Sequence, residues 1–207
     1  MDFRKVDRKL CLIQDSRLVQ VLDPEQKTQA NAVLFCGYID HIKGLTYEAL
    51  GLVRCEEDDY VLLSDAQGIG LKVRADSIDE LQIKPIENAE LENRFRNSID
   101  TLSVYYRSKD IASVRELTEL DPFRQPLHPD DVCALFLTHE NRLEKMWVRS
   151  EKAAQAADGM LLIAGRLLNE PGNIPGLHMG DTVTLTVIET THGKQCVGVP
   201  GIVAIDR

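Results

Sequence analysis

One helical stripe separates two sets of short strand-like segments in this chain, and this division limits the folds open to it. Within residues 88–108, five large apolar side chains recur at spacings of four, four, three and four residues: Leu91, Phe95, Ile99, Leu102 and Tyr106. This spacing places them on one face of an α-helix. The sequence therefore predicts one amphipathic helix over 88–108 that packs on a sheet.

The segment before this helix is typical of a small all-β module. Residues 10–83 contain short apolar or alternating runs that are separated by turn residues. The stretches 56–59 and 65–68 lie between such runs and are expected to be hairpin connections. Short strands at this spacing favour a strongly bent sheet or barrel. We therefore expect residues 1–86 to form a β-barrel-like module of SH3-like size.

The segment after residue 86 combines helices with an antiparallel sheet. A second, shorter helix is expected to begin with Asp110 as its N-cap. In the run 182–190, Val183, Leu185 and Val187 alternate with threonines, which indicates a half-buried strand. The predicted class is α+β: the barrel-like module first, then residues 87–207 as an antiparallel sheet with one or two packing helices.

Charge and hydropathy exclude several classes of function. The 207 residues carry 24 Lys and Arg against 33 Asp and Glu, a net charge of −9. Binding to bare nucleic acid requires clustered cations, so no nucleic-acid partner is expected. The short apolar runs at 10–13 and 160–164 do not reach the length of a secretory or membrane-spanning segment. The sequence predicts a cytoplasmic protein with no membrane partner.

No motif in the sequence selects a reaction. It lacks a nucleophile elbow, a phosphate-binding loop and a dinucleotide fingerprint. Its five cysteines are widely spaced and odd in number, which is typical of buried thiols rather than of disulfides or a metal centre. We therefore predict no catalytic residue, no metal, no cofactor and no enzyme activity.

Two features favour binding to another protein. In the strand-like run 144–148, alternation places Lys145, Trp147 and Arg149 on one face, which suits a contact surface. The acidic excess is greatest at the front, since residues 1–90 hold 11 Lys and Arg against 17 Asp and Glu. The four consecutive acidic residues there are expected to contact a basic partner: Glu56, Glu57, Asp58 and Asp59.

An alternative hypothesis is a small-ligand-binding protein, or a hydrolase-type enzyme, with a site between the two modules. It requires that six polar side chains converge on one ligand: His128, Asp130, Asn169, Glu170, His178 and Asp181. Each of them is also typical of a loop or strand entry. Convergence of these side chains in space would distinguish the two hypotheses.

A resemblance adds to the binding hypothesis. The strand 144–149, the segment from Gly165 to Pro171 and the segment 178–183 carry Glu-x-Met-Trp-Val, Gly-x-Leu-x-Asn-x-Pro and Gly-Asp-x-Val patterns. Together they resemble an uncharacterised bacterial α+β domain family, over roughly residues 128–200. Related domains recur among immunity proteins of polymorphic toxin systems. The resemblance implies an immunity or inhibitor protein that occludes a bacterial toxin, and it implies no catalytic residues.

Overall fold

The computed structural model describes residues 2–57, 59–66, 68–78, 83–156 and 159–201. The chain divides into two compact units, residues 1–107 and 108–207. Strands make up 46% of the chain and helices 22%, so the predicted mixed α and β class is confirmed. No helix in the described ranges is long and apolar enough to cross a bilayer.

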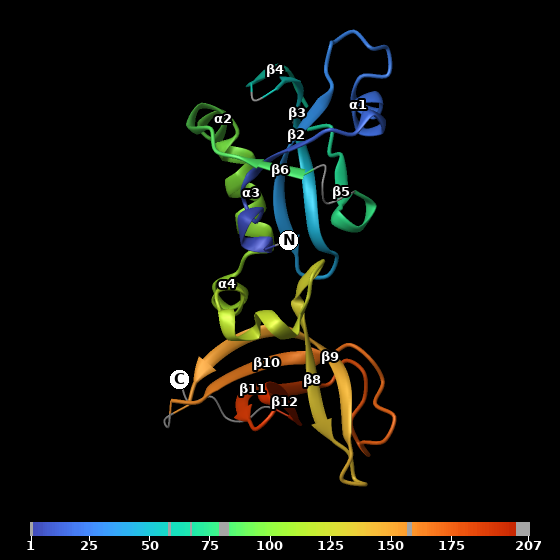
Figure 1. The fold of residues 1–207 in the computed structure, drawn as a ribbon, viewed down its shortest axis with the longest axis vertical. Coiled ribbons are helices and arrows are strands. Elements are labelled where there is room, and N and C mark those ends of the chain that lie inside the picture. Colours follow the sequence, from blue (N-terminus) through green and yellow to red (C-terminus); the bar gives the residue numbers. More distant parts are fainter. Residues whose placement is uncertain (1, 58, 67, 79–82, 157–158, 202–207) are drawn as a thin grey trace. The chain divides into compact units, whose positions relative to one another are not determined.

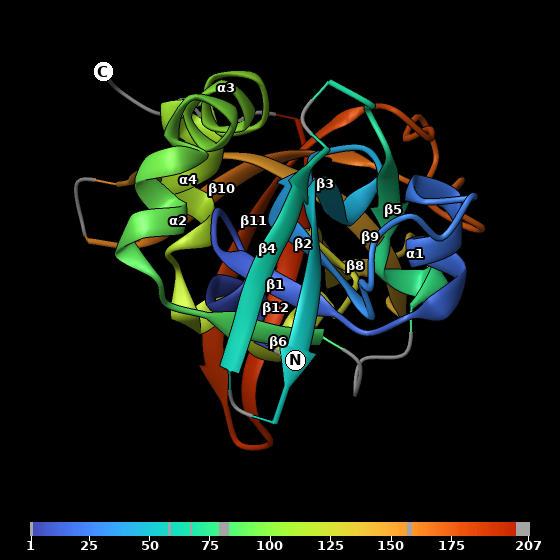
Figure 2. The same cartoon turned by 90° about the horizontal axis from the view of Figure 1, so that it is seen from above.

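The first unit is a curled antiparallel sheet with helices. Its elements are η1 (Phe3–Lys5), β1 (Leu10–Ile13), α1 (Ser16–Leu22), β2 (Ala32–Asp40), β3 (Gly44–Glu56), β4 (Asp59–Asp65), β5 (Lys72–Arg74), η2 (Ala75–Ser77), β6 (Ile83–Ile86), α2 (Ala89–Arg94) and α3 (Arg96–Tyr106). The strand order is β4-β3-β2-β1-β6, and β5 also pairs with β3. Helices α2 and α3 lie on one side of this sheet, whereas α1 lies on the other (Figure 1 and Figure 2).

The predicted helical stripe packs on this first sheet. Phe95 and Leu102 are buried against β1 and β2, and the other three members of the stripe pack around them. Because Phe95 interrupts the helix, the predicted single helix is two, α2 and α3. The Asn88 side chain caps α2 by accepting the Leu91 N–H at 3.0 Å.

The second unit contains a closed barrel of five strands. Its elements are α4 (Lys109–Arg115), η4 (Thr118–Phe123), β7 (Arg124–Gln125), β8 (His128–Leu137), β9 (Leu143–Gln155), β10 (Leu161–Leu167), β11 (Thr182–Thr190) and β12 (Gly193–Pro200). Strands β8 to β12 pair in chain order, and β12 then pairs with β8 in parallel, which closes the barrel. Ser108, rather than Asp110, is the N-cap of α4.

Close packing inside the barrel depends on Gly198. This residue pairs with Phe136 at the closing seam. A Cβ at Gly198 would lie 2.2 Å from Cζ of the Phe136 ring, so the ring occupies the space that a side chain would need. Val114 of α4 and Leu120 of η4 complete the apolar core. The barrel therefore closes through the pairing of β8 with β12, and the helices that precede β8 in the chain contribute to its core.

The predicted order of the two modules is not confirmed. The structure has the helix-covered sheet in the first unit and the closed barrel in the second, with the division at Arg107 instead of residue 86. The physical reason is that the stripe around Phe95 finds its apolar partners on β1 and β2, which precede it in the chain.

Candidate functional site

The strand that carries Trp147 has the predicted alternation. On β9, Met146 and Val148 are fully buried in the barrel core, while Lys145 and Trp147 are exposed on the outside. Arg149 shares this outer side. The alternation of the three outward residues that was read from the sequence is thus confirmed.

Neighbouring strands extend this surface. Across β8 and β9, Leu137 pairs with Leu143, Leu135 with Lys145 and Cys133 with Trp147, and on the other edge of β8, Val197 of β12 pairs with Leu135. Paired residues share a face of a sheet, so their side chains form one surface. We define its six large apolar members as the outer apolar face: Leu135, Leu137, Leu143, Trp147, Val197 and Val199.

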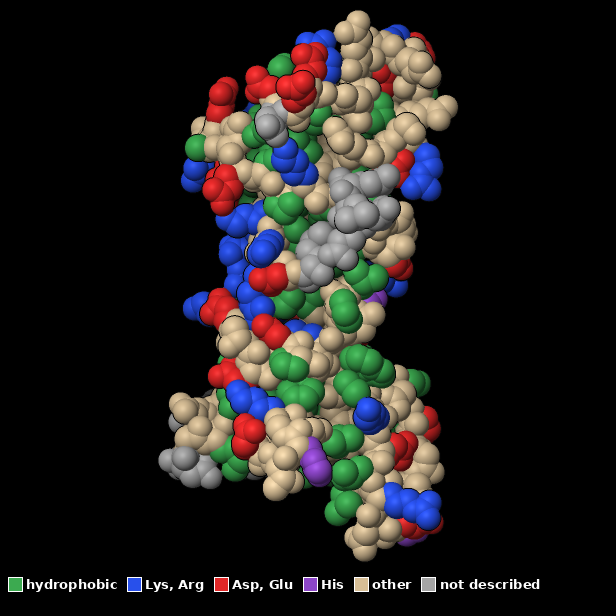
Figure 3. All heavy atoms as spheres, in the orientation of Figure 1, with side chains coloured by type: hydrophobic (Ala, Val, Ile, Leu, Met, Phe, Trp, Pro, Cys, Tyr) green, Lys and Arg blue, Asp and Glu red, His purple; other side chains and the backbone are tan. Residues whose placement is uncertain are grey.

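The outer apolar face is open over much of its area. Leu143 is 64% exposed, Leu137 62%, Val199 48% and Trp147 39%, while Leu135 and Val197 are half-buried. Figure 3 shows hydrophobic side chains gathered over β8 and β9. At its border, Arg142 and Glu140 form an exposed ion pair. This combination of an apolar centre and a charged margin is typical of a protein contact.

The backbone at Trp147 is held by the loop that follows β10. The Trp147 N–H donates to Asn169 Oδ1 at 2.8 Å, and the Trp147 carbonyl accepts the Leu168 N–H at 2.8 Å. Asn169, one of the predicted ligand residues, therefore uses its side-chain oxygen to fix the strand under Trp147. The loop continues the pairing of β9 beyond the end of β10.

Arg149 has a different environment from the one expected. Its guanidinium donates to both carboxylate oxygens of Asp131, at 2.8 and 3.1 Å. Both side chains are mostly buried, and the two-pronged geometry is the strong form of an arginine–carboxylate pair. Arg149 therefore ties β9 to β8, and Lys145 is the exposed cation beside Trp147.

Three predicted ligand residues do meet, in the loop between β10 and β11. Glu170 Oε1 lies 2.8 Å from His178 Nδ1, and its other oxygen accepts the Met179 N–H at 2.9 Å. Asp181 Oδ2 accepts the His178 N–H at 2.8 Å. The Met179 N–H and His178 lower the pKa of Glu170, and Glu170 raises the pKa of His178. These exposed groups close the loop on itself.

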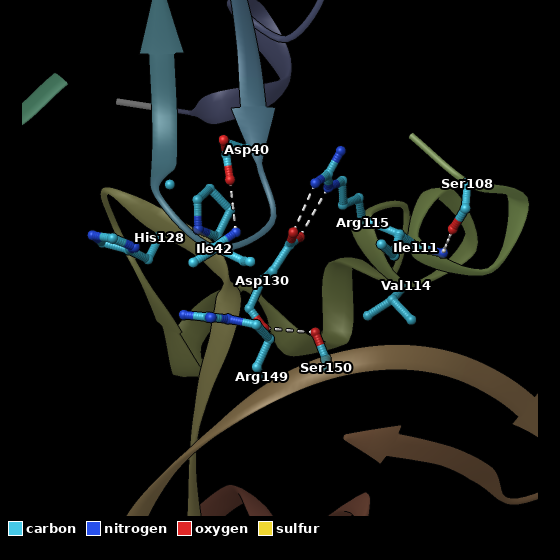
Figure 4. A network of polar contacts seen from close by, with 12 residues as sticks. Asp40, Ile42, Ser108, Ile111, Val114, Arg115, His128, Asp130, Arg149 and Ser150 are labelled. Carbon is cyan, nitrogen blue, oxygen red and sulfur yellow. Dashed lines mark hydrogen bonds and ion pairs between the residues drawn. The ribbon is translucent and has the colours of Figure 1, made fainter. Parts of the chain in front are cut away.

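The other two predicted ligand residues lie elsewhere on the barrel. Asp130, expected in a strand-entry loop, is in β8, and its carboxylate accepts from Arg115 Nε at 2.8 Å and from a terminal guanidinium nitrogen at 2.7 Å. Figure 4 shows Arg115 of α4 directed at Asp130, with Ser150 bonded to the Asp130 carbonyl. His128 Nδ1 lies 4.0 Å from Asp131. The six side chains therefore do not converge on one ligand.

The acidic quartet lies at the predicted hairpin between β3 and β4. Glu56 pairs with Asp59, Glu57 has a left-handed φ of 54°, and Asp58 lies outside the described residues. The described members are exposed. The division of charge changes with the observed boundary: residues 1–107 hold 14 Lys and Arg against 19 Asp and Glu, and residues 108–207 hold 10 against 14. The net charges, −5 and −4, are nearly equal, so charge no longer favours the first unit.

Three of the five cysteines lie in apolar surroundings. Burial raises the pKa values of Cys11, Cys36 and Cys196 to about 12, which keeps these thiols protonated and unreactive. Within the part of the chain that the structure describes, no group of three or more His, Cys, Asp or Glu side chains is arranged to hold a metal ion.

Comparisons of this chain with protein-family models, with curated proteins and with solved structures give no match. The surface must therefore be interpreted from its own residues. The sequence singles out Trp147 but not the other five members of the face. The three leucines meet through the pairing of β8 with β9, and the two valines of β12 join them through the pairing of β12 with β8. Alternation around the buried Cys196 is the local signal that points Val197 and Val199 outward.

Proposed function

We propose that this protein is a non-enzymatic protein-binding module that contacts its partner through the outer apolar face. We further propose that it is an immunity or inhibitor protein that occludes a bacterial toxin in the cytoplasm. The observation that carries the first proposal is the exposed apolar surface that β12, β8 and β9 share around Lys145. Large exposed apolar patches with a polar border mark interaction sites on soluble proteins.

Trp147 is the expected centre of the contact. Tryptophan is enriched among the few interface residues that dominate binding energy, because its large ring loses much water-exposed area. Its backbone N–H and carbonyl are both hydrogen-bonded to the loop that follows β10. A prearranged anchor loses little conformational entropy on binding, which favours affinity. Lys145, which lies between Leu143 and Trp147 on the same side of β9, supplies a hydrogen-bond donor within the contact.

The toxin proposal is supported by charge and by the resemblance in the C-terminal third. Toxins that attack nucleic acid need a basic surface, and an acidic partner associates with such a surface faster and more selectively. Both units of this chain are acidic. The three strand and loop patterns of residues 144–183 resemble a domain family related to immunity proteins. The partner class that fits is a basic toxin, and nucleic acid itself does not fit.

Co-expression with the products of neighbouring genes tests this function. We expect one of them to arrest growth when expressed alone, and this protein to restore growth and to co-purify with it. Leu143→Lys is expected to abolish rescue and co-purification. Val61→Lys is the matched control, since Val61 is also an exposed apolar strand residue but lies on β4 in the first unit.

Two outcomes would contradict the proposal. If no neighbouring product is toxic or binds this protein, the immunity function is wrong. If a partner binds but Leu143→Lys and Val61→Lys behave alike, the outer apolar face is not the contact.

A further inference from the structure

A hollow of about 470 Å³ lies in the first unit, where α3 faces the paired strands β3 and β5. The strands contribute Glu48 and Lys72, which are directly opposed in the β3–β5 register. The helix contributes the polar side chains of Asn97, Ser98 and Thr101 together with the apolar or aromatic side chains of Leu102, Tyr105 and Tyr106. The volume is within the range of about 300–1,000 Å³ that small-molecule sites occupy.

The hollow contains one positive and one negative group side by side. Lys72 Nζ lies 3.4 Å from Glu48 Oε2, and it lies 5.7 Å from the centre of the Tyr106 ring. Partial burial opposes the charge on Lys72, but Glu48 and Tyr106 outweigh it and raise the pKa of the ammonium group. Both charged groups are partly open to solvent. The lining therefore offers a charged donor and a charged acceptor at no net charge.

This lining favours a neutral ligand rich in hydroxyl groups. An anion drawn to Lys72 would also meet Glu48, and a cation drawn to Glu48 would also meet Lys72, so the pair gives neither ion a net attraction. A hydroxyl group both donates and accepts, so neighbouring hydroxyls can accept from Lys72 and donate to Glu48. The amide of Asn97 adds another donor and acceptor. The Tyr105 ring, 78% exposed, offers a flat apolar surface for the C–H face of such a molecule.

We propose that this hollow is a binding site for a neutral polyhydroxylated molecule, a sugar or cyclic polyol. The site is separate from the outer apolar face, which lies in the other unit, and it does not depend on the proposed immunity function. The carbohydrate ring packs against Tyr105, and its hydroxyls bond to Lys72, Glu48 and Asn97.

Amide NMR shifts of the full-length protein test this inference directly. The probes are D-glucose, D-galactose, D-mannose and myo-inositol, with glutamate, putrescine and alanine as an anion, a cation and a zwitterion. We expect saturable shifts with at least one polyol, confined to β3, β5 and α3, and no saturable shift with the three charged probes.

Variants show whether the hollow itself binds the probe. Lys72→Met and Tyr105→Ala are expected to weaken binding by at least about tenfold, as loss of a polar or aromatic partner does. Val104→Ala is the matched control, because Val104 is the exposed neighbour of Tyr105 and does not line the hollow. The amide spectrum of each variant verifies that the unit is folded.

The inference is overturned if no polyol gives saturable shifts, if a charged probe binds more tightly than every polyol, or if both variants bind like Val104→Ala. Trp147→Ala should leave the polyol titration unchanged. Failure of this site therefore leaves the toxin-binding proposal intact, and the reverse also holds.

Discussion

Gly198→Ala tests the closure of the barrel that carries the outer apolar face. An alanine Cβ there would lie 2.2 Å from Cζ of Phe136 and 2.6 Å from Cε1 and Cε2. Carbon atoms in proteins pack at about 3.5–4.0 Å, so the ring would have to move by more than about 1 Å. Phe136 is fully buried at the seam between β8 and β12 and has no free space to enter.

The expected loss of stability follows from that displacement. Overpacking of a filled core costs about 1–3 kcal/mol, and expulsion of a phenylalanine ring would forfeit roughly 1.5–3 kcal/mol of burial. We predict that Gly198→Ala lowers the free energy of unfolding of the second unit by about 3 kcal/mol. With a urea slope of about 1–3 kcal/mol per molar, the midpoint falls by about 1–3 M.

Urea unfolding followed by tryptophan fluorescence measures this change in the second unit alone, because Trp147 is the only tryptophan in the chain. Phe136→Leu in the Gly198→Ala background should recover part of the loss, since the smaller side chain makes room for the new methyl group. Val199→Ala, at the exposed next position, is the control and should change stability by less than about 0.5 kcal/mol. A Gly198→Ala midpoint equal to that of the control would refute the packing argument.

Three further predictions concern residues that the sequence marked as site candidates. Asp130→Asn should destabilise the second unit by about 3–5 kcal/mol in the same urea assay, because it leaves the buried Arg115 without its carboxylate partner. Replacing both Asp130 and Arg115 by apolar residues should restore most of the loss. An unchanged midpoint for Asp130→Asn would contradict the structural role of this ion pair. The pKa of the His178 ring, measured by NMR, should lie above its ordinary value of 6.5, and Glu170→Gln should return it toward that value. The contribution of His178 to loop closure is lost as pH rises through this raised pKa. The contribution of Glu170 is lost as pH falls through the lowered pKa of its carboxyl group, which lies below 4.5. Replacing Glu56 and Asp59 by lysine should slow association with a basic partner and flatten its salt dependence, because these charges contribute to long-range attraction. The dissociation rate should not change, since the hairpin lies outside the outer apolar face, and unchanged association rates would remove these charges from the steering of the partner.

Features set by neighbours in the chain could be predicted from the sequence. The alternation of Val183 and Leu185 with threonines gave a strand over 182–190, and β11 has those bounds with both residues buried. The helical stripe around Phe95 and the outward position of Trp147 were likewise predictable. In each case the side-chain period alone determines which face is buried.

Features set by distant partners could not be predicted in the same way. Nothing local indicates that Phe95 packs on the preceding strands rather than on the following ones, so the sequence alone assigns the helices to the second module, an order that the structure does not confirm. The local sequence around Asp130 and Asp131 predicts a loop before a strand, because their arginine partners are distant in the chain. Arg115 precedes Asp130 by 15 residues, and Arg149 follows Asp131 by 18 residues. The full outer apolar face depends on β12 pairing with β8, some 60 residues away in the chain.

The affinity of this protein for the toxin that we propose as its partner tests the central claim most directly. It is measured by isothermal titration with wild type, Trp147→Ala and Val61→Lys. Loss of an anchoring tryptophan costs about 2 kcal/mol or more, so the Kd for Trp147→Ala is predicted to rise by roughly 30-fold or more. Val61→Lys should bind like wild type. An equal Kd for wild type and Trp147→Ala would contradict the assignment of the outer apolar face as the binding surface.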